Sequence, residues 1–270
     1  MYSLLMSVYA GEKPSYLAEA LCSIHDAPHR VGLDEVVLVR DGPLPVELTD
    51  VIEQWNGRLP IKHVVLRKNS GLTAALNEGL KHVVSPWVMR FDSDDVCLPS
   101  RFRVQHALMV SGEWDLIGAQ IGEFDEDSSA PHQWRRVPIG QDEIRRYSRR
   151  RNPFNHMTVC YRTELARALG GYPALPFMED YAMWVGMLQS GARATNSPEV
   201  LVHARVGAGL YARRGGWMYA VREYQLQRHL CRVGHKPMAE GILDGLMRGA
   251  VFLCPESVRR WVYERLLRRS

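Results

Sequence analysis

Three carboxylates lie within four positions of one another, between two apolar segments. Asp92, Asp94 and Asp95 follow the apolar run 87–89, and a second apolar segment begins at Val96. Carboxylates this close together repel one another, so a fold retains them where a positive charge, most often a divalent cation, lies beside them. A solvated acidic turn is the other interpretation, and these residues alone leave both open. If the cluster binds a cation, its hard oxygen ligands favour Mg²⁺ or Mn²⁺ over zinc.

A second pair of acids, Glu179 and Asp180, directly precedes an apolar segment with helical spacing at residues 181–188. Carboxylates at a helix N-terminus are stabilised by the helix dipole, so a structural capping role would explain them. The functional interpretation is a general base that faces the same site as the first cluster. The local sequence does not distinguish these two roles.

The composition is that of an ordinary globular α/β protein. Of the 270 residues, 46% are hydrophobic and 24% are charged, with a formal net charge of +4, which predicts one large domain or one domain with an extension. The five cysteines are scattered without a C-x-x-C pair, which disfavours a disulfide framework and a structural zinc site. No signal-peptide pattern is visible and no apolar run approaches the ~20 residues that span a bilayer. We therefore expect a cytoplasmic protein.

The first 99 residues alternate between strand-like and helix-like patterns. Apolar runs predict strands at residues 3–9, 35–40, 61–66 and 87–89, and amphipathic segments predict helices at 14–24, 49–55 and 72–83. The strands are continuous apolar runs, so both faces of a parallel, doubly wound sheet are covered. Ligands bind at the carboxyl ends of such strands, where Tyr9, Asp41, Asn69 and the acid cluster would converge. The absence of G-x-G-x-x-G after the first strand, and of a P-loop motif, disfavours the usual dinucleotide and P-loop sites.

The second half of the chain has a less regular pattern. Apolar runs predict strands at residues 116–124, 154–161 and 200–206, and helical spacing recurs at 100–110, 163–169, 181–188, 217–234, 237–253 and 256–268. Residues 133–151 hold seven arginines against two acids, and their pattern predicts no particular element.

Seven short motifs, taken in order, resemble those of family 2 glycosyltransferases over roughly residues 2–210. They are Ser7-Val8-Tyr9, Val39-Arg40-Asp41-Gly42, Asn69-Ser70-Gly71, Asn77-Glu78-Gly79, Asp92-Ser93-Asp94-Asp95, Gly170-Gly171-Tyr172 and Glu179-Asp180-Tyr181-Ala182-Met183-Trp184. Further stretches that begin at Arg40, Arg151 and Arg213 are similar to a narrower group of bacterial enzymes. That group builds O-antigen and exopolysaccharide repeat units, and it includes amylovoran-type and β-1,3-galactosyl transferases.

The resemblance implies a GT-A fold, in which helices flank a Rossmann-like, mostly parallel central sheet. Residues 1–210 would form the glycosyltransferase domain, with a nucleotide-binding half at 1–99 and an acceptor-binding half at 100–210. Residues 211–270 would form a C-terminal helical extension.

The resemblance also implies how a nucleotide-sugar donor is bound. Tyr9 would stack on the uracil and Asp41 would accept its N3–H, with Ser7 and Asn69 in the same site. Tyr9 also has a purely structural interpretation, as an aromatic residue at the edge of the core. Asp92 would lie near the ribose or the donor sugar.

The remaining acids would serve the diphosphate and the acceptor. Asp94 and Asp95 would hold Mn²⁺ or Mg²⁺ against the diphosphate, because the leaving group gathers negative charge as the glycosidic bond breaks. Asp180 would be the base that deprotonates the acceptor hydroxyl, and Glu179 would help to bind the acceptor.

Other residues carry both a structural and a functional interpretation. Asn155 and His156 are candidates for acceptor contacts, although a lone histidine is often structural. Arg213 and Arg214 precede two glycines and form either a plain basic turn or a loop that closes over a diphosphate. Residues 255–270 combine apolar residues with five arginines, which predicts either a helix packed on the domain or one that docks on the anionic inner face of the cytoplasmic membrane.

The function expected from these features is an inverting, metal-dependent transfer of a sugar to a lipid-diphosphate-linked saccharide acceptor. Galactose from UDP-galactose is the expected donor on the narrower resemblance alone. A sugar-phosphate nucleotidyltransferase is the main alternative, although the basic, Gly-rich loop usual after its first strand is poorly matched at residues 10–13. A binder of nucleic acid or of another anionic surface is disfavoured because the basic residues are scattered and the acid clusters would repel phosphates.

Overall fold

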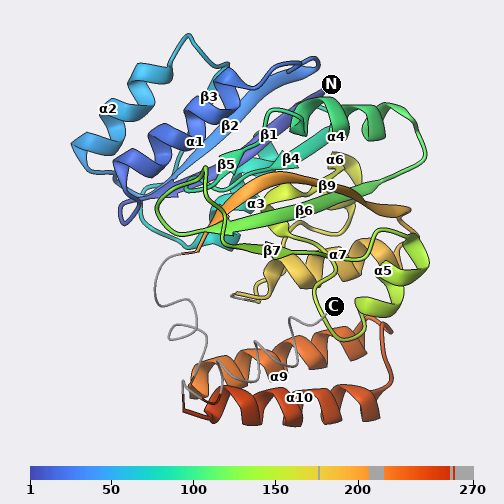
Figure 1. Ribbon diagram of the computed structural model, residues 1–270. Coiled ribbons are helices and arrows are strands. Elements are labelled where there is room, and N and C mark those ends of the chain that lie inside the picture. Colours follow the sequence, from blue (N-terminus) through green and yellow to red (C-terminus); the bar gives the residue numbers. More distant parts are fainter. Residues whose placement is uncertain (176, 207–215, 256–257, 259–270) are drawn as a thin grey trace.

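The computed structural model describes residues 1–175, 177–206, 216–255 and 258, and within them a nine-stranded sheet forms the centre of the molecule (Figure 1). The strands lie in the order β3-β2-β1-β4-β8-β6-β9-β5, and β7 pairs with β6 outside this path. Their bounds are Tyr2–Tyr9 (β1), Leu33–Asp41 (β2), Ile61–Val65 (β3), Trp87–Arg90 (β4), Val96–Cys97 (β5), Leu116–Phe124 (β6), Gln133–Arg135 (β7), Cys160–Arg162 (β8) and Ala194–Arg205 (β9). The helices are Pro14–Asp26 (α1), Val46–Trp55 (α2), Leu72–His82 (α3), Arg101–Val110 (α4), Gln141–Tyr147 (α5), Thr163–Ala168 (α6), Glu179–Gln189 (α7), Trp217–Arg232 (α9) and Met238–Leu253 (α10), with a 3-10 turn at His156–Thr158 (η1).

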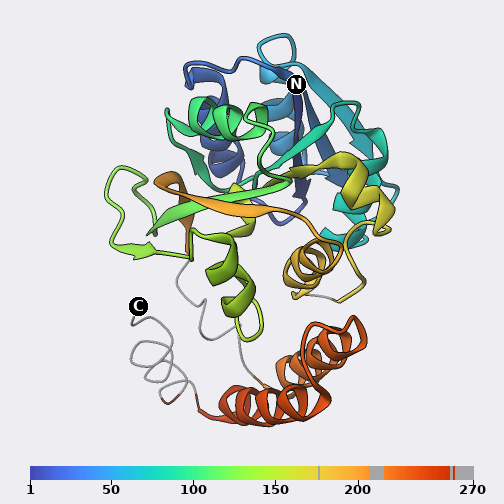
Figure 2. The same ribbon diagram turned by 90° about the vertical axis from the view of Figure 1, so that its right-hand side faces the viewer.

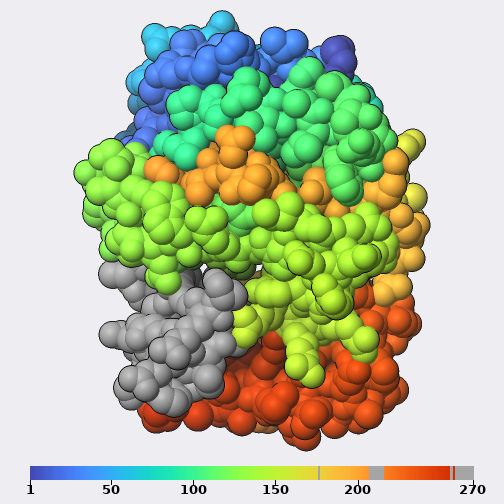
Figure 3. All heavy atoms as spheres, turned by 45° about the vertical axis from the view of Figure 1, so that its right-hand side comes forward, coloured from blue at the N-terminus to red at the C-terminus, as the bar shows by residue number. Residues whose placement is uncertain are grey.

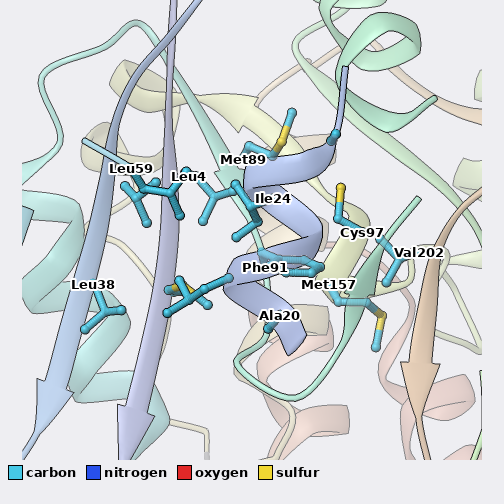
Figure 4. Close-up of a cluster of buried hydrophobic side chains, with 14 of the residues drawn as sticks. Leu4, Ala20, Ile24, Leu38, Leu59, Met89, Phe91, Cys97, Met157 and Val202 are labelled. Carbon is cyan, nitrogen blue, oxygen red and sulfur yellow. The ribbon is translucent and has the colours of Figure 1, made fainter. Parts of the chain in front are cut away.

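The first four predicted strands pair in parallel, as expected for a GT-A sheet. Strand β1 pairs with β2 and β4, and β2 pairs with β3. Successive side chains of β1 face opposite sides of the sheet. Leu4 and Met6 join a core cluster with residues of α1 and α2 (Figure 4), whereas Leu5 joins a second cluster with residues of α3. Because both faces are buried, the strand is a continuous apolar run, and each such side chain contributes roughly 1.5–3 kcal/mol of burial free energy.

The sheet is not parallel throughout, because β8 runs antiparallel to both of its neighbours, β4 and β6. Strand β8 begins only at Cys160, so the prediction of a strand over residues 154–161 is wrong for most of its length. The cause is local hydrogen bonding, since the N–H and Oγ1 of Thr158 donate to the Asn155 carbonyl at 2.8 and 2.7 Å and close a 3-10 turn. This turn brings His156 beside the acid cluster that follows β4.

Strand β9 is longer than the apolar run 200–206 predicted. It begins at Ala194, and its residues 194–197 already pair in parallel with β6. Asn196 and Ser197 are polar, so this part of the strand does not form an apolar run and was not predicted. At its other end it pairs with β5, which follows the acid cluster directly. The two halves of the chain are thus joined at that cluster.

Helices α9 and α10 form an antiparallel hairpin at one end of the molecule, below α7 (Figures 1 and 2). Leu226 and Leu230 of α9 pack against Tyr181, Ala182 and Val185 of α7. None of the described helices is long and apolar enough to cross a membrane.

Candidate active site

Two buried arginines hold the acid cluster in place. Arg90, at the end of β4, forms an ion pair with Asp92. Arg205, at the end of β9, donates from Nε to the Asp94 carbonyl at 3.0 Å, and its backbone N–H donates to Asp95 Oδ1 at 2.8 Å. Since β4 and β9 are not neighbours in the sheet, the shape of the cluster depends on the tertiary fold.

Asp92 stays ionised because it lies between two positive groups. Burial disfavours its charged form, but the charges of Arg90 and His156 outweigh that effect and hold its pKa well below the ordinary range. His156 Nε2 lies 2.7 Å from Asp92 Oδ2.

Asp94 and Asp95 carry more negative charge than the surrounding protein compensates. Burial and the charges of Asp92 and Glu12 raise the pKa of Asp94 to about 7, and burial and the neighbouring acids raise that of Asp95 well above its ordinary value. Asp95 Oδ2 is buried and has no hydrogen-bond donor among the described residues. A bound cation would satisfy that oxygen and lower both pKa values, so these residues fit a metal site.

The type of ligand suits Mg²⁺ or Mn²⁺. Both are hard cations, and Mg²⁺ in particular is bound by one or two carboxylates and completes its coordination with phosphate oxygens and water. In the part of the chain that the structure describes, no three His, Cys, Asp or Glu side chains are grouped so that they could hold a metal ion by themselves.

Glu179 and Asp180 occupy the first turn of α7. Asp180 Oδ1 accepts the Tyr181 N–H at 2.7 Å, and Asp180 Oδ2 accepts the side-chain amide of Asn152 at 2.7 Å. Glu179 is buried, and that burial together with the Asp180 charge raises its pKa. The N-cap of α7 is Met178, which makes no side-chain capping bond, so Asp180 is not the cap of this helix. Its Oδ2, held by Asn152, faces the residues of the cleft described below.

His156 connects the two acidic groups that the sequence placed about 85 positions apart. Its Nε2 contacts Asp92, and its Nδ1 lies 3.7 Å from Asp180 Oδ2. Burial opposes the imidazolium form, but the charges of Asp92 and Asp180 prevail and raise the pKa of His156. Its side chain is 37% exposed, so it can also touch a bound substrate.

These groups line one cleft of about 430 Å³ between the sheet and the helical hairpin. The apolar part of its wall includes Leu72 and Leu76 of α3, Tyr219 of α9 and Phe252 of α10. The structure thus brings together six of the predicted site residues, namely Asp92, Asp94, Asp95, His156, Glu179 and Asp180.

Tyr9 and Asp41 lie side by side, where β1 and β2 end. Tyr9 is 49% exposed, so its side chain is accessible to a ligand. The Asp41 carboxylate accepts the backbone N–H groups of Ser70 and Gly71 at 2.7 and 2.9 Å, which ties the loop after β3 to the end of β2. Each oxygen keeps a second lone pair that can accept a hydrogen bond from a ligand.

This second group of site residues does not line the cleft itself. Ser7, Tyr9, Asp41 and Asn69 all lie outside its wall. A direct link joins the two regions, since Ser93 in the acid cluster donates to Glu12, in the turn after Tyr9, at 2.8 Å.

Asn155 has a structural role in this fold. Its side chain is fully buried, and Nδ2 donates to the Ala119 carbonyl at 2.8 Å, so it braces η1 against β6. An acceptor contact by Asn155 stays a prediction. Arg213 and Arg214 lie outside the described residues.

Three residues that hold the site were not singled out from the sequence. Asn152 orients Asp180, while Arg90 and Arg205 fix the acid cluster. Arg90 and Arg205 each end an apolar strand, and a charged residue at such a position was the available signal.

The chain is similar to known glycosyltransferases along nearly its whole length. The model of "Glycosyl transferase family 2" matches residues 3–168. The amylovoran biosynthesis glycosyltransferase AmsE of Erwinia amylovora is 38% identical over 98% of this chain and 98% of its own length. The UDP-Gal:alpha-D-GlcNAc-diphosphoundecaprenol beta-1,3-galactosyltransferase of Escherichia coli is 35% identical over 99% of this chain and 97% of its own length.

Solved structures share the fold at low sequence identity. S. aureus TarS 1-349 superposes with a TM-score of 0.68 and 17% identity, covering 98% of this chain and 75% of TarS 1-349. The mannosyltransferase PcManGT from Pyrobaculum calidifontis, in complex with GDP-Man and Mn²⁺, gives a TM-score of 0.65 and 16% identity, covering 98% of this chain and 79% of its own. The predicted GT-A fold is thereby confirmed.

Proposed function

The chain belongs to glycosyl transferase family 2, and we propose that it is a metal-dependent, inverting enzyme that moves galactose from UDP-galactose to a lipid-diphosphate-linked saccharide. The observation that carries this proposal is the cleft in which the cluster Asp92–Asp95 faces Asp180 across His156. One group suits a diphosphate and the other suits a hydroxyl that must lose a proton. Their meeting in one cleft is what a single displacement reaction requires.

The donor end of the site would bind the nucleotide. Tyr9 would stack on the uracil, Asp41 would accept N3–H beside Ser7 and Asn69, and Asp92 would lie near the ribose or sugar. Support comes from the adjacent positions of Tyr9 and Asp41 at the strand ends. TarS 1-349 has been solved in complex with UDP-GlcNAc and with UDP, and the Escherichia coli relative is named for a UDP-Gal donor.

Asp94 and Asp95 would hold Mn²⁺ or Mg²⁺, which supplies positive charge against the diphosphate of the leaving group. Asp180 would take the proton of the acceptor hydroxyl as its oxygen attacks the anomeric carbon. The bond to the UDP oxygen breaks on the opposite face, so an α-linked donor gives a β-linked product. His156 would lie between Asp92 and Asp180 and help to position them, and Glu179 would contact the acceptor.

The acceptor would be a saccharide on a lipid diphosphate. Two relatives support this proposal through their names, one for amylovoran biosynthesis and one for a GlcNAc-diphosphoundecaprenol acceptor. Such an acceptor would place the enzyme at the cytoplasmic face of a membrane. Residues 255–270, with five arginines among apolar residues, would contact that face. Arg213 and Arg214 would contact a diphosphate. Most of these residues lie outside the described part of the chain.

The test is thermal unfolding with UDP, GDP, CMP or ATP, each with Mn²⁺ or with EDTA. We expect UDP to stabilise the protein only with metal, by about 2.7 kcal/mol at a hundredfold excess over Kd. Asp94→Ala and Asp95→Ala should each lose the metal-dependent part of this shift, whereas Asp50→Ala, which removes an exposed acid of α2, should keep it. The proposal would be contradicted if no nucleotide changed the unfolding temperature, or if the two site substitutions left the metal-dependent shift unchanged. Product analysis by NMR with a panel of UDP-sugars then identifies the donor.

A further inference from the structure

The α9–α10 hairpin buries polar side chains and exposes apolar ones. Its buried residues include Glu223, Gln227, Lys236 and Asp244. The exposed apolar residues of α10 are Met238, Ile242, Leu243, Leu246, Met247 and Leu253. A surface helix in water shows the reverse arrangement, because apolar side chains gain free energy by facing the core.

Every charged residue of α10 is directed to the rest of the protein. The helix has three, Glu240, Asp244 and Arg248, and their ion-pair partners, at 2.6, 2.7 and 3.2 Å respectively, are Arg149, Lys236 and Glu223. Figure 3 shows the segment that carries Arg149 (lime green) lying against the hairpin (red). The Lys236–Asp244 pair is buried, and such a pair costs desolvation free energy that an apolar contact would not.

The outer face of α10 is therefore uncharged along its whole length. Turning 100° per residue places positions 238, 242, 243, 246, 247, 250 and 253 on one half of the helix, and none of them is charged. The face is roughly 24 Å long, at 1.5 Å per residue. The hairpin forms one end of the molecule (Figures 1 and 2).

The outer side of α9 supplies aromatic and basic residues. Trp217 and Tyr224 are exposed, as are Arg228 and Arg232, and the four share one side of the helix. An uncharged apolar face with aromatic and cationic neighbours is the pattern of a helix that lies in the interface of an anionic bilayer.

We infer that the outer face of the α9–α10 hairpin docks on an anionic bilayer, with α10 lying in the plane of the interface. This surface is distinct from residues 255–270. The inner side of the same hairpin lines the cleft through Tyr219 and Phe252. Docking would thus hold the cleft about one helix diameter, ~10 Å, from the bilayer. That consequence for a lipid-linked acceptor rests on the proposed function, whereas the docking does not.

The experiment is flotation of the full-length chain with vesicles of phosphatidylcholine containing or lacking about one-third phosphatidylglycerol. We expect the wild type to float with the anionic vesicles and Ile242→Ser/Leu246→Ser to lose at least about tenfold in partition, since two apolar side chains would no longer be buried in the bilayer interface. The matched control is Val84→Ser/Val110→Ser, which removes two apolar side chains of similar exposure from outside the hairpin. It should float as the wild type does. Equal melting temperatures of all three would show that folding is unchanged.

Three results would overturn the inference. The first is that the wild type does not float, and the second is that the Ile242→Ser/Leu246→Ser variant floats as well as the wild type. The third is that light scattering shows a wild-type dimer which the two substitutions convert to a monomer, while neither protein binds vesicles. Transfer to a short-chain, water-soluble acceptor, measured alongside, separates the two proposals. Transfer without flotation defeats only the docking, and flotation without transfer of any sugar defeats only the proposed function.

Discussion

At the scale of single residues, the site depends on carboxylates that share a cleft but differ in their partners. Asp92 is paired with Arg90 and His156, whereas Asp95 has a buried oxygen to which none of the described residues donates. Asp180 accepts an amide from Asn152 and faces His156. These different surroundings are what would let one acid hold a cation while another accepts a proton.

Asp180→Asn should abolish transfer while leaving UDP binding nearly intact. The amide cannot accept the proton of the acceptor hydroxyl, and loss of a general base costs on the order of 10²–10⁴-fold in kcat. Asp142→Asn is the matched control, because Asp142 also lies in the first turn of a helix, α5, but outside the cleft. Steady-state kinetics and UDP titration measure the two effects. Wild-type turnover in Asp180→Asn would show that another group is the base.

His156→Gln should lower stability more in acid than in alkali. The folded-state pKa of His156 is raised, so the stability it contributes is complete below its unfolded value of about 6.5 and is lost as pH rises through the folded value. Asp92 remains ionised at pH 5.5 because its own pKa is lowered. Urea unfolding with EDTA at pH 5.5 and pH 9 compares the variant with the wild type. An equal loss at both values would mean that the imidazolium does not interact with Asp92 and Asp180 as described.

At the scale of elements, helices α3 and α7 carry the site because each packs closely on a neighbour. Gly79 lets α3 approach the sheet: a Cβ there would lie 2.5 Å from Leu5 Cδ1 and 2.7 Å from Val39 Cγ2. On the other side of the cleft, α7 lies between the core of the sheet and the hairpin, so Trp184 packs inward while Tyr181 packs on α9.

Gly79→Ala should destabilise the fold by about 1–3 kcal/mol, because the added methyl overpacks the contact between α3 and the sheet. Gly186→Ala is the matched control within α7, where the nearest atom to a new Cβ is 3.6 Å away. It should be neutral or stabilising by up to roughly 1 kcal/mol, since glycine is unfavourable inside a helix. Urea unfolding measures both. A loss in Gly186→Ala as large as that in Gly79→Ala would remove close packing as the explanation.

At the scale of the whole molecule, the cleft forms where the two halves of the chain meet. Strand β5 directly after the acid cluster pairs with β9, and Arg205 at the end of β9 holds Asp94 and Asp95. The hairpin closes the other side of the cleft. We therefore propose that the α9–α10 hairpin completes the wall of the site through Tyr219 and Phe252, and that residues 211–270 are an extension of the domain formed by residues 1–210.

The sequence by itself determined the first four parallel strands, the identity of the acidic groups and the family. Continuous apolar runs such as 35–40 arise only where both faces of a strand are buried, so they can be read locally. The motifs around Asp92–Asp95 and Asp180 were equally local, since spacing along the chain defines them.

Only the tertiary structure decided which residues hold those groups in place. Arg205 reaches Asp94 across 111 positions, and Asn155 braces η1 because its buried side chain donates to the Ala119 carbonyl of β6. For the same reason, the sequence did not indicate which face of α10 points to the solvent. Periodicity predicts that α10 has one apolar face, but not whether that face meets the protein, and here ion pairs to Arg149, Lys236 and Glu223 turn it outward. Contacts between distant segments set these orientations, and spacing along the chain does not record them.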